Sequence, residues 1–134
     1  MTAVPSKSLE RIRELVEQGL PELPEPLELN GGWVSYPVDR GGVLSRALFN
    51  ESIAAAALSV FEPKTKFPRH AHEEREWLIV LDGELSIQVG RDSRRMLTGD
   101  FIYLPPGTEH EIRTGRLETQ VLAVTVPRSP RFPT

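Results

Sequence analysis

The residues best suited to chemistry are the three histidines, which fall in two short segments of the chain. His70 and His72 stand in the run Pro-Arg-His-Ala-His, and Glu76 follows four residues after His72. His110 follows the run Pro-Pro-Gly-Thr-Glu. Neutral imidazole nitrogens together with a carboxylate oxygen are typical ligands of divalent transition metals. The sequence therefore predicts one metal site formed by His70, His72, Glu76 and His110.

The spacing of these residues indicates how the chain must present them. Residues two apart share a face on a strand but point in different directions on a helix, so a strand is favoured for His70 and His72. Four extended residues span about 13 Å, whereas metal–ligand bonds are about 2 Å long. His72 and Glu76 can therefore share an ion only if residues 73–75 bend, as at a hairpin tip. Glu73 and Glu74 are kept as weaker substitutes for Glu76.

The donor set restricts the kind of metal. Three neutral imidazoles and one carboxylate would leave a divalent ion with a net charge of about +1 and, if six-coordinate, about two open positions. Such a site suits Mn, Fe, Co, Ni, Cu or Zn better than Ca or Mg. The chain has no cysteine, so the set does not resemble a closed structural zinc site. Open positions would accept a bidentate substrate or dioxygen, and loading should fall as the pH drops through about 6.5.

Length and composition exclude several classes of protein. The chain has 134 residues, which is the size of one domain, and without cysteine it has neither disulfides nor a thiol nucleophile. Its 16 basic and 19 acidic residues argue against binding to a phosphate backbone. Its first residues do not resemble a signal peptide, and its apolar stretches fall far short of the roughly 18 residues that a membrane span needs. We expect a cytoplasmic protein without nucleic-acid or membrane partners.

Three regions are distinguished along the chain. Residues 1–26 contain a predicted helix over Ser6–Gln18, ended by Gly19, and then a proline-rich connector. Residues 27–127 read as β structure, and residues 128–134 form a proline-rich tail. The apolar stripe of the helix consists of Leu9, Ile12, Val16 and Leu20.

Short apolar runs separated by turn residues predict a β-sandwich or barrel. Asp82-Gly83 lies between two such runs and predicts a two-residue hairpin, since both residues tolerate positive φ. The predicted strands are Trp33–Tyr36, Leu44–Phe49, Leu58–Phe61, Trp77–Leu81, Leu85–Val89, Phe101–Leu104, Glu109–Arg113 and Thr119–Val126.

The spacing of the candidate ligands and turn residues resembles the two motifs of the cupin family. The first motif, His-x-His, three residues, Glu, six residues, Gly, is matched by His70, His72, Glu76 and Gly83. The second, Gly, five residues, Pro-x-Gly, two residues, His, is matched by Gly99, Pro105, Gly107 and His110. Lys64 stands where the first motif usually begins with glycine, and Thr114 stands in place of a terminal asparagine. Both departures concern local turns outside the ligand set.

The resemblance covers residues 58–126 and implies a small antiparallel β-barrel of the jelly-roll kind, with the ion held inside it. Strand parity places Leu78 and Val80 on the same side as Glu76, and Ile112 on the same side as His110. An apolar lining of this kind would favour a small, partly hydrophobic ligand.

A fold of this kind does not determine the function. One hypothesis is a metal-dependent enzyme with dioxygenase-, isomerase- or lyase-type chemistry on a small organic molecule. Its general base is not assigned, although Tyr36, Tyr103 and Gln88 carry suitable groups. The alternatives are a non-catalytic module that senses or stores a small ligand with the same metal site, or a metal that only braces the barrel.

The chain is also expected to form a homodimer. Apolar residues could join edge strands across a twofold axis. The proposed strip consists of Trp33, Val34, Phe49 and the alanine run Ala54–Ala57.

Overall fold

The computed structural model describes residues 27–28, 32–36, 38 and 40–128. The predicted helix, its connector and the last residues of the tail lie outside these ranges. Every regular element among the described residues is a β-strand, as expected from the sequence. No helix in this part of the chain is long and apolar enough to cross a membrane.

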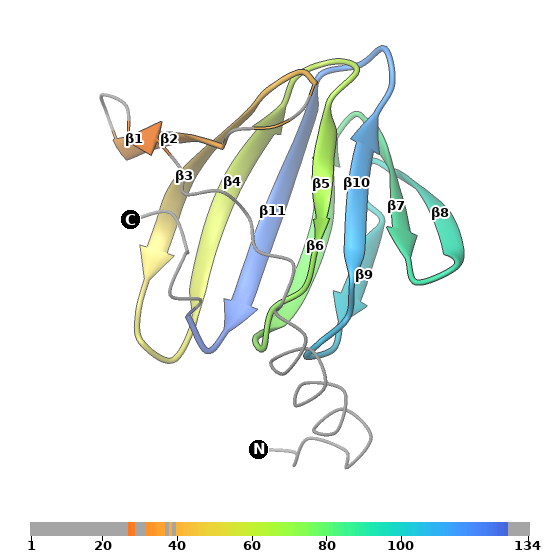
Figure 1. The fold of residues 1–134 in the computed structure, drawn as a ribbon. Coiled ribbons are helices and arrows are strands. Elements are labelled where there is room, and N and C mark those ends of the chain that lie inside the picture. The colour runs from red at the N-terminus through yellow and green to blue at the C-terminus, as the bar shows by residue number, and fades with distance from the viewer. Residues whose placement is uncertain (1–26, 29–31, 37, 39, 129–134) are drawn as a thin grey trace.

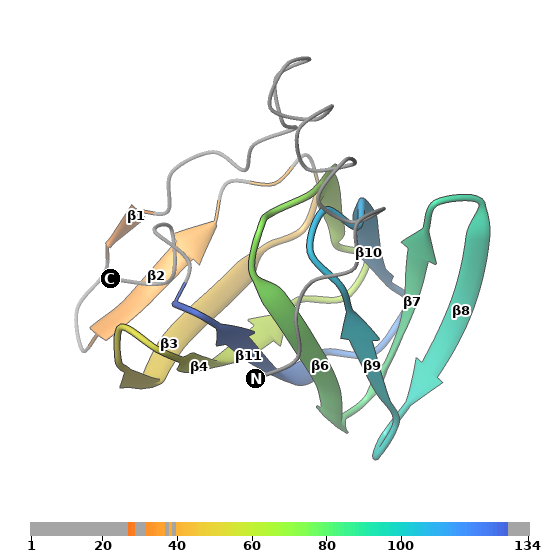
Figure 2. The same ribbon diagram turned by 90° about the horizontal axis from the view of Figure 1, so that it is seen from below.

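The strands form two antiparallel sheets that curve around a common interior (Figures 1 and 2). The larger sheet has the strand order β1-β2-β3-β4-β11-β6-β9, and the smaller has the order β5-β10-β7-β8. The strands are β1 (Leu27–Glu28), β2 (Trp33–Tyr36), β3 (Val43–Asn50), β4 (Ala55–Phe61), β5 (Lys66–His70), β6 (Arg75–Asp82), β7 (Glu84–Val89), β8 (Asp92–Leu97), β9 (Phe101–Leu104), β10 (His110–Thr114) and β11 (Thr119–Val126).

Alternation of apolar and polar residues accounts for the two faces of these strands. In β7, Leu85 and Ile87 are buried while Ser86 and Gln88 are exposed. Buried side chains from both sheets meet in one core, so that each sheet covers the apolar face of the other. The core consists of Val43, Phe61, Phe67, Leu78, Val80, Leu85, Ile87, Met96, Leu104, Ile112 and Val121.

The predicted hairpin at Asp82-Gly83 is wrong. β6 pairs with β11 and β9 in the larger sheet, whereas β7 pairs with β10 and β8 in the smaller. Gly83 therefore carries the chain from one sheet to the other, with a φ of 103°. A Cβ atom there would lie 2.7 Å from the carbonyl oxygen of Glu118. Two apolar runs around a tight turn can thus belong to different sheets, a distinction that local turn chemistry does not make.

The two departures from the family motifs leave the local turns intact. Lys64 adopts a φ of 57°, a conformation that favours glycine, which explains why glycine is usual there. Its amide donates a 2.7 Å hydrogen bond to the carbonyl of Gly115. The Thr114 hydroxyl accepts a hydrogen bond from the amide of Thr65 and donates one to the carbonyl of Glu62. Thr114 therefore fastens this turn by its side chain.

The apolar strip proposed for dimer contacts is not an exposed edge. Val34 and Ala55–Ala57 are buried, and β4 lies inside the larger sheet between β3 and β11. Phe49 is 47% exposed, and Trp33 and Ala54 are partly buried, so only part of the predicted strip reaches the surface. Small apolar residues such as these alanines do not reveal from the sequence which side of a sheet they occupy.

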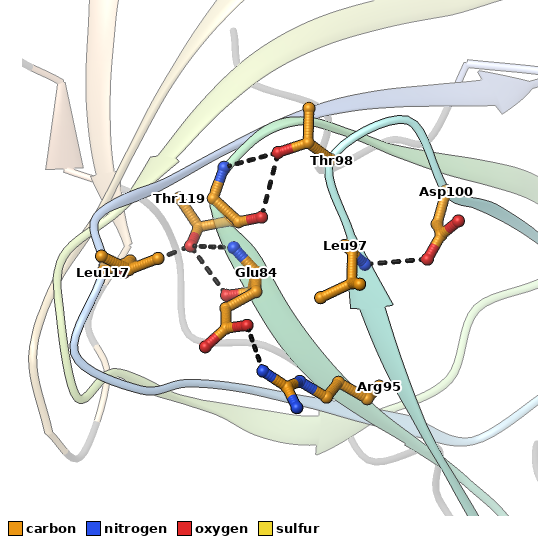
Figure 3. A network of polar contacts seen from close by, with 8 residues as sticks. Glu84, Arg95, Leu97, Thr98, Asp100, Leu117 and Thr119 are labelled. Carbon is orange, nitrogen blue, oxygen red and sulfur yellow. Dashed lines mark hydrogen bonds and ion pairs between the residues drawn. The ribbon is translucent and has the colours of Figure 1, made fainter.

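Thr119 anchors the crossing from β6 to β7 (Figure 3). Its fully buried hydroxyl accepts from the amide of Glu84 at 3.2 Å and lies within donating distance of the carbonyls of Glu84 and Leu117. Thr98, which is exposed, bonds the amide and carbonyl of Gly83 from the other side. Two threonines thus satisfy the backbone where it leaves one sheet for the other.

We expect Thr119→Val to lower the free energy of unfolding by about 1–3 kcal/mol, because it removes a buried hydroxyl that bonds the partly buried amide and carbonyl of Glu84. Urea unfolding followed by fluorescence measures this loss. Thr98→Val is the matched control and should cost less, since water can replace an exposed hydroxyl. Equal losses for the two variants would contradict the role assigned to Thr119.

Candidate functional site

Three separate segments bring the predicted ligand residues together. His70 ends β5, Glu76 is the second residue of β6, and His110 begins β10. His70 and His110 are directly paired across β5 and β10 in the smaller sheet, whereas Glu76 belongs to the larger sheet. The site therefore lies between the two sheets, which explains why residues remote in sequence can meet.

The nitrogens of His70, His72 and His110 that could bind an ion lie within 4.8 Å of one another. The Oε1 atom of Glu76 is 3.4 Å from Nε2 of His72 and 3.3 Å from Nε2 of His110. All four predicted residues are thus gathered at one place. Glu73 is exposed, and Oε2 of Glu74 lies 3.6 Å from Nδ1 of His72, the ring nitrogen that does not face Glu76.

The expectation that one strand carries both His70 and His72 is wrong. β5 ends at His70, and His72 lies in the connection that leads to β6. The amide of Gly107 donates a 2.8 Å hydrogen bond to the carbonyl of His72, which fastens this connection to the loop before β10. Residues 73 and 74 bend, as the length argument required, and so return the chain to the site at Glu76.

Backbone carbonyls fix how the imidazoles are oriented. Nδ1 of His70 and of His110 each lie 2.9 Å from the carbonyl oxygen two residues earlier. Nδ1 of His72 lies 3.1 Å from the carbonyl oxygen of Glu74. When Nδ1–H donates to these oxygens, each Nε2 can present a lone pair to an ion, the arrangement usual for metal-binding histidines.

The resulting donor set fits a divalent cation. The Nε2 atom of His110 is buried and has no hydrogen-bond partner among the described residues. It faces a carboxylate oxygen, and two acceptors in contact are unfavourable unless a positive charge lies between them. A transition metal bound by Nε2 atoms and Oε1 would satisfy all of these groups.

The environment shifts the pKa values of these groups in opposite directions. Burial, together with the neighbouring His110, lowers the pKa of His70 to about 3. Burial also acts to lower the pKa of His72, but the hydrogen bond with Glu76 and its negative charge outweigh it, so this pKa is raised. Burial opposes ionisation of Glu76, yet the neighbouring imidazoles of His110 and His72 hold its pKa well below the usual range. Glu76 is therefore ionised in the folded protein.

A cavity of about 110 Å³ adjoins the four residues. Engineered cavities of about 150 Å³ hold one benzene ring, so this smaller enclosed space suits only a small ligand. Leu78 and Ile112, which parity placed toward the ion, are part of its lining, and Val80 is buried in the core beside it. The lining consists of Tyr36, Val43, Ser45, Ala57, Ser59, Phe61, Phe67, His70, His72, Glu76, Leu78, His110, Ile112, Val121, Ala123 and Thr125.

Of the three candidate general bases, only Tyr36 lines this cavity. Burial and the negative charge of Glu76 raise the pKa of Tyr36 to about 12, so its hydroxyl stays protonated at neutral pH. Tyr103 is 41% exposed, with its ring centroid 5.0 Å from that of Trp77, and Gln88 is exposed on β7. Tyr36 is therefore a hydrogen-bond donor in the cavity rather than a ready base.

Three polar residues of the lining were missed by the sequence reasoning. Ser45 and Ser59 face each other with their Oγ atoms 2.6 Å apart, and Oγ1 of Thr125 is buried without a partner. Thr125 pairs directly with Glu76 across β11 and β6. Strand parity could have placed all three inside the barrel, but only once the pairing of the strands was known.

Comparisons with known proteins agree with the resemblance that the two motifs indicate. A model of the Cupin domain matches residues 57–126. Quercetin 2,3-dioxygenase of Bacillus subtilis (strain 168) is 31% identical over 61 residues, covering 45% of this chain and 18% of that protein. The H2HPP isomerase of Bacillus subtilis is 30% identical over 117 residues, covering 84% of this chain and 44% of that protein. The chain thus spans less than half the length of either relative.

Solved structures resemble the fold at low sequence identity. KdgF from Halomonas sp. gives a TM-score of 0.64 at 17% identity, covering 80% of this chain and 89% of that one. An RmlC-like cupin from Shewanella frigidimarina NCIMB 400 gives 0.66 at 17% identity, covering 80% and 97%. At this identity the likeness shows the architecture only.

The pKa shifts predict how the stability of chelator-stripped protein depends on pH. Because the folded pKa of His70 is lowered from 6.5 to about 3, stability is lost as the pH falls below 6.5, where only the unfolded chain binds the proton. His72 affects stability in the opposite direction. Its stabilising contribution is fully present below pH 6.5 and is lost as the pH rises through its raised folded pKa.

Urea unfolding between pH 5 and pH 7 tests this prediction. His70→Gln should raise the stability at pH 5 relative to that at pH 7, compared with the unmodified protein. His72→Gln is the matched variant and should lower the stability at pH 5 relative to that at pH 7. Changes of the same sign in both variants would show that the two imidazoles do not differ as described.

Proposed function

Because the chain belongs to the cupin family, we propose that it is a metal-dependent enzyme that acts on a small oxygen-bearing organic molecule inside its barrel. The observation that carries the proposal is the convergence of three imidazoles and one carboxylate at the wall of an apolar cavity. The same residues in a filled core would support only a bracing role, and a cavity without them would support only binding.

The Nε2 atoms of His70, His72 and His110 and the Oε1 atom of Glu76 are the proposed ligands. Mn, Fe, Co, Ni, Cu and Zn all suit this set, which does not select among them. A bound ion of this kind would polarise substrate oxygens, and iron or manganese would also support chemistry with dioxygen.

The other residues of the cavity favour dioxygen-dependent cleavage over isomerisation. Isomerisation by proton transfer requires a positioned base. Among the described lining residues, the proposed ligands are the only side chains that could serve as one near neutral pH, since the Tyr36 hydroxyl stays protonated. Tyr36 would instead donate its O–H to a substrate oxygen, while apolar walls such as Phe67 exclude water.

We expect Glu76→Gln to weaken metal binding by more than the roughly 10- to 100-fold typical of losing an outer-shell partner. Glu73→Gln is the matched control, since Glu73 is exposed and should not change affinity. Elemental analysis of protein purified without chelator or affinity tag, followed by metal titration of the three proteins, measures the effect. Equal affinities for all three would remove Glu76 from the site.

Turnover is tested on the same proteins after loading with Fe²⁺ or Mn²⁺. We expect consumption of dioxygen with small phenols or diketones such as 4-ethylcatechol and acetylacetone, and products that together contain the substrate and both oxygen atoms of dioxygen. Glu76→Gln should abolish this consumption. Binding of these molecules without turnover would instead favour the sensing or storage module.

We also propose that the chain forms a homodimer, although through a different surface from the strip considered first. Apolar residues remain exposed on paired strands β6 and β9, including Phe101 and Tyr103. Light scattering at micromolar concentration should give twice the mass of one chain. A single-chain mass at that concentration would exclude a dimer of useful stability.

A further inference from the structure

The register of the larger sheet arranges the cavity floor in rows of side chains. Neighbouring strands β4, β11 and β6 place directly paired residues beside one another on the inner face. The row at the candidate metal site is Ala55, Thr125 and Glu76, the next is Ala57, Ala123 and Leu78, and the third is Ser59, Val121 and Val80, continued on β3 by Ser45.

The middle row leaves room because two of its three members are alanines. Ala57 and Ala123 line the cavity and are directly paired. The rows on either side carry hydroxyl groups, from Thr125 in one and from Ser45 and Ser59 in the other. These two polar rows are four residues apart, which is about 13 Å along a strand. The floor is therefore polar at both ends and apolar between them.

The serine pair has a hydroxyl proton left to donate. Ser45 and Ser59 are 2% and 9% exposed, and each finds only the other as a hydrogen-bond partner among the described residues. Two hydroxyls carry two protons, and one of them is used between the two oxygens. Since both groups line the cavity, the second proton is available to an acceptor inside it.

Thr125 supplies an unsatisfied group at the opposite end. Its side chain is 5% exposed, and Oγ1 has no hydrogen-bond partner among the described residues. A buried hydroxyl without a partner is costly, and Thr125 stands beside Glu76, where the oxygens of a ligand would meet the site. Ligand oxygens there would satisfy it.

The absence of positive charge in the described lining restricts the charge that the ligand can carry away from the metal site. No lysine or arginine is present among the described residues that line the cavity. With a net charge of about +1 at a loaded site, one negative charge on the ligand would be balanced there. A second charge, as in a phosphate ester or a dicarboxylate, would be buried without a partner at the far end.

We propose that the substrate is a compact molecule with adjacent oxygens at one end and an uncharged hydrogen-bond acceptor at the other. The oxygens meet the histidine–glutamate site and Thr125, the apolar body lies over Ala57 and Ala123, and the Ser45–Ser59 pair donates to the acceptor. This assignment rests on the proposed function and adds the class of molecule to it.

Three catechols that differ only at the far end test the assignment. 3,4-Dihydroxyacetophenone carries an uncharged acceptor, 4-ethylcatechol carries none, and 3,4-dihydroxybenzoate carries a charge. Calorimetric titration of the Zn²⁺-loaded protein measures binding without turnover. We expect the acetophenone to bind about five- to tenfold tighter than the ethyl compound, as one hydrogen bond predicts, and the benzoate to bind most weakly.

The double variant Ser45→Ala/Ser59→Ala should abolish the preference for the acetophenone while keeping its Zn²⁺ content. Ser93→Ala, on the exposed strand β8, is the matched control and should keep the preference. Ala123→Leu, which fills the middle row, should weaken both uncharged catechols. If the double variant fails to fold, the assignment is still tested by the order of the three affinities for the unmodified protein and by the effect of Ala123→Leu.

Equal binding of the three catechols, or a preference that survives the double variant, would overturn the assignment while leaving the proposed function in place. Failure of the Zn²⁺-loaded protein to bind any of them would overturn the assignment together with small-ligand binding by this site. The first outcome would reject the role given to the end of the cavity remote from the metal site. The second would reject ligand binding by the cavity as a whole.

Discussion

The interaction on which the site depends is the hydrogen bond from each imidazole Nδ1 to a backbone carbonyl. These bonds, from His70, His72 and His110, leave the opposite nitrogens available to bind an ion. Glu76 adds a carboxylate that its histidine neighbours keep ionised despite burial. The barrel therefore gathers nitrogen and oxygen donors that a divalent cation would satisfy, without selecting which cation it is.

The fold class and the ligand residues could be predicted because they depend on local information. Alternation in β7 and the spacing from His70 to Glu76 are properties of short segments. Gly83 could not be assigned correctly, because its backbone conformation suits both a hairpin and a crossing between sheets. Whether two adjacent strands pair depends on distant partners, here β11 and β10, which no local pattern identifies.

The cavity lining was harder to foresee than the site for the same reason. Ser45 and Ser59 are far from the histidines in sequence and meet only because β3 and β4 pair in one particular register. Ala57 belongs to the strip predicted for dimer contacts, yet it is buried and lines the cavity. Leu78 and Ile112 were placed correctly, because parity can be counted from a ligand on the same strand.

Glu76 belongs to the larger sheet, whereas His70 and His110 belong to the smaller. An ion bound by all three would therefore link the two sheets of the barrel. Partial opening of the sheets would dismantle the site before either sheet lost its own hydrogen bonds. Slow exchange of backbone amides in β5, β6 and β10 would then depend on occupancy of the site. Occupancy of the candidate metal site would thus also report whether the two sheets are closed against each other.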